Sequence, residues 1–305
     1  ASLDEAAFRA DYMVVTAESD ILSAQHTIAF QEATGWEALP PSFSPLQEGT
    51  LRVTGRQGGT VAVFNVLAAD HVDDEETGYD TLFLDTDKDL ANGYTELHPG
   101  KWAATAISPR LHSGAYFCLT ASDDITAVVY QSRICYSRAR PSELVRTVNA
   151  KFGFPPPVPD LKALSSGWIS PRQYRDMAEL RAQWMMEVVL HVYQTYQPDL
   201  LLTSQGIIAQ CAQPFLLVDE RQEGYTPELA GVYASHLQRA HSLADVNLGR
   251  LLSCVNLENT ILFVLSGHGM MPAHTSVRLN TILGDAWLQR WGRRNDQLVN
   301  DEPNS

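Results

Sequence analysis

The stretch that decides the expected fold is Thr-Ile-Leu-Phe-Val-Leu-Ser-Gly-His-Gly, residues 260–269. It opens with a run of aliphatic, aromatic and β-branched residues, and the glycines then end that run. The pattern therefore predicts a buried strand over Thr260–Leu265, followed by a turn. Asp199–Thr203 has the same character and predicts a second buried strand.

Two long helical patterns accompany these strands. Ser170 and Pro171 are typical of a helix N-cap and first position, and apolar residues then recur every three or four positions up to Val188. Pro227 opens another helix, predicted over 228–252. Uniformly apolar strands alternating with helices are typical of a parallel sheet covered on both faces. We therefore expect residues 141–305 to form an α/β core with a parallel sheet flanked by helices.

Residues 1–140 have a different texture and are expected to form a β-rich region inserted in front of that core. Short apolar and β-branched runs alternate there with turn signals such as Gly58-Gly59 and Asn92-Gly93. The predicted strands are Leu51–Thr54, Thr60–Ala69, Asp80–Asp85, Ala115–Thr120 and Thr126–Cys135.

Composition narrows the classes of function. In 305 residues, 22 lysines and arginines stand against 36 aspartates and glutamates, so the net charge of −14 disfavours a nucleic acid duplex as partner. Hydrophobic residues make up 45% of the chain, yet no apolar run approaches the ~20 residues that span a bilayer, so no membrane partner is expected. The four cysteines form no closely spaced pair, which favours a reducing, cytoplasmic location.

The first residues do not resemble a signal peptide. Asp4, Glu5 and Asp11 occupy a segment that would otherwise be basic and then apolar, and the chain begins with Ala1 instead of methionine. The expectation is a chain that was processed or cut from something longer.

Several motifs in the second half of the chain are informative through their order and spacing. Pro198–Leu202 and Tyr225–Pro227 come first; Ala244–Leu252, the run Ser266-Gly267-His268-Gly269-Met270 and Asn280–Leu283 then follow. In order and spacing they resemble the type I phosphodiesterase/nucleotide pyrophosphatase family of the alkaline phosphatase superfamily, over roughly Trp168 to Leu288. The resemblance implies an alkaline-phosphatase-like fold and metal-dependent hydrolysis of a phosphoric ester or anhydride. It also implies divalent cations, usually zinc, and a phosphoester or nucleotide as the small-molecule partner.

The metal ligands of that family are degenerate in this sequence. The loop Ser204–Phe215 should carry an aspartate and a histidine four residues apart, but Ala209 and Gln213 stand there. In the second loop, Ser266–Pro272, Gly267 replaces an aspartate, and His268 alone is carried over, as a former metal ligand. The family's nucleophile segment and its final histidine have no counterpart within the chain. Loss of one supporting partner already costs ~10–100-fold in metal affinity, so three lost ligands predict no retained metal centre.

We therefore expect a catalytically degenerate member or fragment of the family, in which another chain could supply missing core. In that reading the two loops lie side by side at the carboxyl edge of one sheet. An active phosphodiesterase with atypical ligands is one alternative. A calcium-stabilised binding module is the other.

The calcium alternative rests on the acidic stretch Asp85–Glu96. Acids stand at positions 1, 3, 5 and 12 of this twelve-residue segment, which matches the spacing of EF-hand ligands. Position 6 is Leu90 where the sharp turn favours glycine, and a strand precedes the segment. An acidic turn on the surface is the simpler interpretation.

Other polar residues carry weaker signals. His236 and His241 lie five apart on one predicted helix and so do not share a face. Arg133, Arg138, Arg140 and Arg146 could meet an anionic ligand but more simply pair with the acidic surface. Cys211 is expected to be a small buried side chain.

Overall fold

The computed structural model describes residues 14–55, 58–73, 78–108, 112–275 and 277, and its strands all precede its helices. The strands are β1 (Val14–Ile21), β2 (Ala24–Ala29), β3 (Gln31–Glu32), β4 (Gln47–Thr54), β5 (Thr60–Ala69), β6 (Thr81–Asp85), β7 (Thr95–Leu97), β8 (Trp102–Ser108), β9 (Ser113–Ser122), β10 (Thr126–Gln131) and β11 (Ile134–Arg140). The helices are α1 (Glu143–Phe152), α2 (Leu161–Ser165), α3 (Pro171–Tyr196), α4 (Ile207–Phe215) and α5 (Pro227–Cys254).

The strands form two antiparallel sheets. One sheet has the order β1-β11-β9-β10-β2, with β8 also paired to β9, and the other has the order β3-β4-β5-β6-β7. The two sheets face each other across a core that includes Leu51, Phe64 and Leu84 from one sheet and Phe117 and Val129 from the other. The first part of the chain is thus a β-sandwich.

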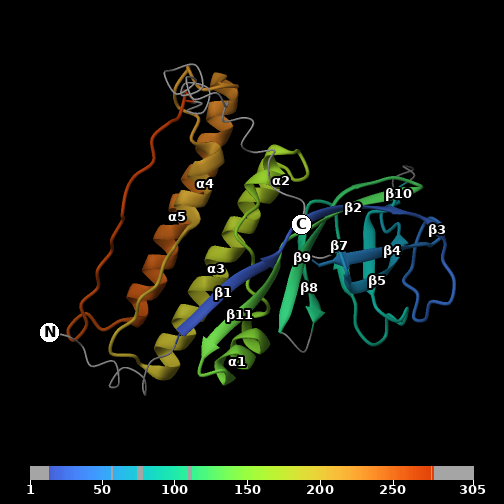
Figure 1. Ribbon diagram of the computed structural model, residues 1–305, viewed down its shortest axis with the longest axis horizontal. Coiled ribbons are helices and arrows are strands. Elements are labelled where there is room, and N and C mark those ends of the chain that lie inside the picture. Colours follow the sequence, from blue (N-terminus) through green and yellow to red (C-terminus); the bar gives the residue numbers. More distant parts are fainter. Residues whose placement is uncertain (1–13, 56–57, 74–77, 109–111, 276, 278–305) are drawn as a thin grey trace, which may run out of the picture.

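The helices cover the other face of the β1-containing sheet (Figure 1). On β10, Val129 points into the sandwich core, while its neighbour Tyr130 belongs to a cluster with Tyr174 of α3 and Phe215 of α4. This alternation follows from the two-residue period of a strand, and it makes the sheet the middle one of three layers.

Side chains tie the sheet to the helical layer at fixed points. Asp160, the N-cap of α2, accepts hydrogen bonds from the hydroxyls of Ser23 and Tyr130. Tyr116 on β9 donates to the carbonyl of Phe154 at 2.8 Å. Trp102 on β8 donates its indole N–H to the carbonyl of Gln173 in the first turn of α3, at 3.0 Å.

The expected parallel sheet flanked by helices is wrong. All strands of the two described sheets pair antiparallel, and they lie before residue 141. Asp199–Thr203 and Thr260–Leu265, the two predicted parallel strands, form no strand.

The physical reason is that each of these segments lacks a neighbouring strand among the described residues. Leu201 and Leu262 both pack against one cluster, formed by Met186, Val189 and Leu190 of α3 with Leu251 of α5. The side chains around them point into solvent: Phe263 is 76% exposed and Leu265 is 88% exposed. A high β propensity needs a paired, half-buried surface to take effect.

Candidate functional site

The loops expected to carry the chemistry do not bring metal ligands together. Ser204–Phe215 is mostly the helix α4, on which Ala209 and Gln213 are both exposed. His268 is also exposed, and its Nδ1 lies 3.0 Å from the carbonyl oxygen of the adjacent Gly269. Gly267 has open space around it. Asn280–Leu283, part of the motif series, lies outside the described residues.

These residues do not fit a dinuclear zinc centre. Alanine and glycine supply no side-chain ligand, and Nδ1 of His268 contacts the backbone carbonyl of Gly269. In the part of the chain that the structure describes, no three histidine, cysteine, aspartate or glutamate side chains gather in a group that could hold a metal ion. Zinc remains an implication of the family resemblance alone, and no reaction step can be derived through it.

The same loop does, however, border a small cavity. Its volume is about 180 Å³, and it lies between α3 and the start of α4. Arg181 and Met185 line it from α3, and Ser204, Gln205, Gly206 and Gln210 line it from the other side. We call it the α4 cavity.

The first turn of α4 borders this cavity through Gly206 and Ile207. Gly206 is the N-cap, and no side chain caps the helix. The first intrahelical bond runs from the amide of Gln210 to the carbonyl of Gly206. The amides of residues 207–209 therefore have no acceptor within the helix, and the helix dipole gives this end partial positive charge.

Gln205 places a further donor beside this helix end. Its Oε1 lies 3.5 Å from Nδ2 of Asn247, an α5 side chain that is itself buried. The amide nitrogen Nε2 of Gln205 is also buried but has no hydrogen-bond partner. A buried donor without an acceptor costs about 1–3 kcal/mol, which a bound acceptor would recover.

Arg181, which lines the cavity, carries a positive charge. Its guanidinium donates to the carbonyl of Pro156, and among the described residues no carboxylate forms an ion pair with it. Burial lowers the pKa of Arg181, and the nearby thiol of Cys135 opposes that shift. A partly buried guanidinium without a carboxylate is a good partner for an oxyanion.

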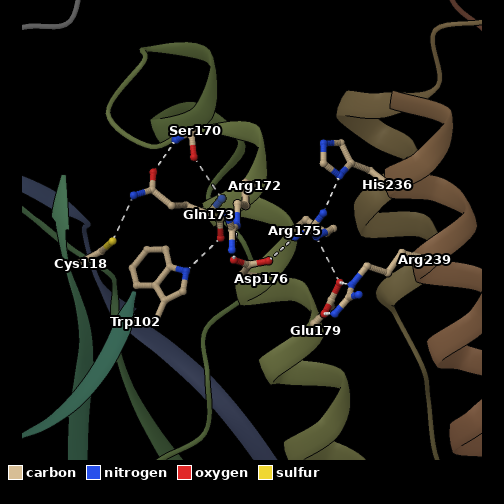
Figure 2. A network of polar contacts seen from close by, with 10 residues as sticks. All are labelled: Trp102, Cys118, Ser170, Arg172, Gln173, Arg175, Asp176, Glu179, His236 and Arg239. Carbon is tan, nitrogen blue, oxygen red and sulfur yellow. Dashed lines mark hydrogen bonds and ion pairs between the residues drawn. The ribbon is translucent and has the colours of Figure 1, made fainter. Parts of the chain in front are cut away.

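A second polar cluster lies nearer the N-terminal end of α3 and contacts α5 (Figure 2). Glu179 is buried and accepts from Nε and Nη2 of Arg239, and its Oε1 lies 3.2 Å from Nε of Arg175. Arg175 also pairs with Asp176 at 2.7 Å and donates to the ring of His236 at 3.0 Å. These contacts join α3 to α5 through side chains that the sequence did not single out as functional.

The same view shows how the start of α3 is fixed. The Ser170 hydroxyl accepts from the amide of Gln173, and the Gln173 side chain accepts from the amide of Ser170, which completes a capping box. Gln173 also donates to the sulfur of Cys118 on β9 at 3.2 Å. Burial raises the pKa of this thiol to about 12, so Cys118 is not a nucleophile at neutral pH.

The four cysteines are free thiols, and Cys211 is fully buried, as expected. Burial raises its pKa to about 11. Within the described residues no helix is both long enough and apolar enough to cross a membrane. No protein-family model, curated protein or solved structure matches this chain.

Proposed function

We propose that this chain binds a small phosphoester or nucleotide phosphate in the α4 cavity and does not hydrolyse it. The observation that carries the proposal is Arg181, a partly buried cation that has no carboxylate partner among the described residues and lines a cavity at an uncapped helix N-terminus. Backbone amides at a helix start, a guanidinium and a free amide donor are the groups that hold phosphate in proteins.

Catalysis is not part of the proposal because the groups that would perform it are not assembled. Hydrolysis in the resembled family needs cations to neutralise the phosphoryl oxygens and to activate a nucleophile. Here the corresponding positions are Ala209, Gln213 and Gly267, and His268 lies exposed on its own. The chain would act by sequestering or sensing its ligand.

The direct test is calorimetric titration of the full chain with inorganic phosphate and with a nitrophenyl phosphate ester, in the presence of a chelator. We expect Arg181→Met to weaken binding at least tenfold, since an ionised hydrogen bond is worth about 1.5–3 kcal/mol. Arg172→Met removes a charge from an exposed position of the same helix and should leave affinity unchanged. Equal affinity in the Arg181 and Arg172 variants would refute the proposed site.

A second measurement separates binding from catalysis. Metal analysis of the purified chain should find no stoichiometric zinc, and a nitrophenyl phosphodiester should not be cleaved above background. Tightly held zinc together with turnover that His268→Ala abolishes would instead establish an active phosphodiesterase with atypical ligands.

We also propose that another polypeptide covers the apolar segments 199–203 and 260–265. The supporting observation is that Leu202, Ile261, Phe263 and Leu265 are each more than three-quarters exposed, which is costly in water. Sedimentation velocity should show association that grows with concentration and that Phe263→Asp/Leu265→Asp reduces. A monomer at all concentrations, alone and with its cellular extract, would argue against a covering chain.

A further inference from the structure

His236 occupies an unusual position for a titratable group. It lies on α5 and is only 7% exposed, and its Nδ1 is 3.0 Å from Nη1 of Arg175 on α3 (Figure 2). A guanidinium can only donate hydrogen bonds, so Nδ1 must accept. The imidazole is therefore held uncharged, with its proton on Nε2.

The groups around this ring do not favour a second positive charge. From α3, Arg175, Asp176 and Glu179 face it, and α5 itself contributes Arg239. Both carboxylates already pair with guanidiniums: Asp176 with Arg175 and Arg172, and Glu179 with Arg175 and Arg239. Three guanidiniums thus already outnumber two carboxylates before the histidine gains a proton.

Two aromatic rings also lie close to His236. The ring of Phe215 on α4 lies 4.7 Å from it, and the ring of Tyr233, one helical turn earlier on α5, lies 6.4 Å away. Aromatic packing against Phe215 restricts the ring from swinging towards water. A protonated imidazole could therefore escape Arg175 only if α5 moved away from α3 and α4.

We propose that His236 makes the contact between α3 and the first half of α5 acid-labile. Proton uptake removes the acceptor that Arg175 uses and adds a cation to a cluster whose carboxylates are already paired. The first half of α5 then loosens while the second half stays packed on Met186 and Leu190 through Leu251.

The direction of titration agrees with this geometry. Burial lowers the pKa of His236 below its ordinary 6.5, Arg175 lowers it further, and Asp176 and Glu179 oppose the shift. A lowered pKa means that the folded state disfavours protonation of His236 relative to the unfolded state. Its stabilising contribution is present above pH 6.5 and is lost as the pH falls through the lower, folded value.

The loosened region borders a cavity of about 670 Å³. Tyr233 lines it together with Trp168 and Pro214. Acidification would therefore change a cavity wall as well as a helix contact, which is how a proton could regulate what this face of the molecule holds.

Hydrogen exchange measured by mass spectrometry at pH 7.5 and pH 5.5, corrected for intrinsic rates, tests the proposal on the full chain. In the unmodified protein, amides of residues 230–240 should lose several-fold more protection at pH 5.5 than those of residues 245–254. His236→Asn should abolish this difference, because the asparagine Oδ1 can accept from Arg175 but does not titrate. His241→Asn, an exposed change on the same helix, should behave as the unmodified chain.

Urea unfolding at the same two pH values gives an independent readout that does not depend on local exchange. The unfolding equilibrium constant should rise more on acidification in the unmodified and His241 chains than in His236→Asn, and His236→Gln, also a non-titrating acceptor, should match the asparagine. If both His236 variants lose protection in acid as the unmodified chain does, or if that chain loses none, the proposal is wrong.

Discussion

Glu48 shows how a single carboxylate can be buried without being destabilising. It is 5% exposed, and it accepts hydrogen bonds from Nε1 of Trp36 at 2.7 Å and from Nζ of Lys88 at 2.6 Å. Burial alone would raise its pKa, but the bonds from Lys88 and Trp36 outweigh that effect and bring it to about 2. A buried charge is tolerated when its lone pairs are matched in this way.

We expect Glu48→Gln to lower the free energy of unfolding by about 1.5–3 kcal/mol at pH 7, since it removes charge-assisted bonds and leaves Lys88 without its carboxylate partner. The stabilising contribution of Glu48 is present above its ordinary pKa of 4.5 and is lost as the pH falls towards 2. Urea unfolding between pH 7 and pH 3 should therefore show a smaller acid loss in this variant. Glu32→Gln, at an exposed site, is the matched control.

Gly114 is required by a close approach and not by its backbone angles. A Cβ at this position on β9 would lie 2.4 Å from Cδ2 and 2.5 Å from Cγ of Phe154. The Phe154 backbone is itself fixed by the hydrogen bond from Tyr116. The ring has little freedom to withdraw.

Gly114→Ala should accordingly destabilise the fold by about 1–3 kcal/mol, the usual cost of overpacking a tight contact. Thermal or urea unfolding measures the effect. Gly59→Ala, where a Cβ meets open space, should be close to neutral. A neutral Gly114 variant would mean that the segment carrying Phe154 yields easily.

At the scale of elements, the acidic segment Asp85–Glu96 is a connection between β6 and β7 and not a helix-flanked calcium loop. Oδ2 of Asp85 accepts from the amides of Asp87 and Asp89 at 3.1 and 3.0 Å, so the chain satisfies its own carboxylate. Leu90 is buried in a cluster with Trp36 and Phe83. The sixth position of the segment thus has a packing role.

Millimolar calcium is therefore expected to shift the melting temperature by no more than about 2 °C, which for a domain of this size corresponds to roughly 1 kcal/mol. A site occupied at a hundredfold excess over Kd would add about 2.7 kcal/mol and shift it further. Melting curves with calcium and with a chelator distinguish the two. A larger shift that Asp85→Asn/Asp87→Asn removes would identify a calcium site.

Local sequence signals predicted the elements that depend on local chemistry. Ser170 and Pro171 predicted the start of α3, and the run of β-branched and apolar residues over Thr60–Ala69 predicted β5. The short helix α4 was missed because Ser204–Phe215 was expected to be the loop that follows a predicted strand. The apolar pattern of Thr260–Leu265 predicted a strand. A strand forms only when a second strand pairs with it, and the pattern within a segment does not show whether the rest of the chain supplies one.

The candidate site was harder to predict for the same reason. Arg181 interrupts the apolar stripe between Met177 and Trp184, which is a weak signal that its charge is partly buried. Nothing in sequence indicates that Gln205 would meet Asn247, because the two come from different elements. The burial of His236 on α5 depends on where α3 and α4 pack.

At the scale of the whole molecule, the middle sheet holds the three layers together, and β1 lies at one end of its strand order. β1 pairs antiparallel with β11, from Val14 opposite Arg140 to Ile21 opposite Ile134. The first described strand therefore has its partner more than a hundred residues later in the chain.

During synthesis, β1 is made well before its pairing partner β11. Translation proceeds at ~5–20 residues per second, so β1 leaves the ribosome on the order of ten seconds before β11 exists. Over that interval its unpaired edge is open to strands of neighbouring nascent chains. Only β11, the last of the described strands to be synthesised, supplies the partner that covers this edge.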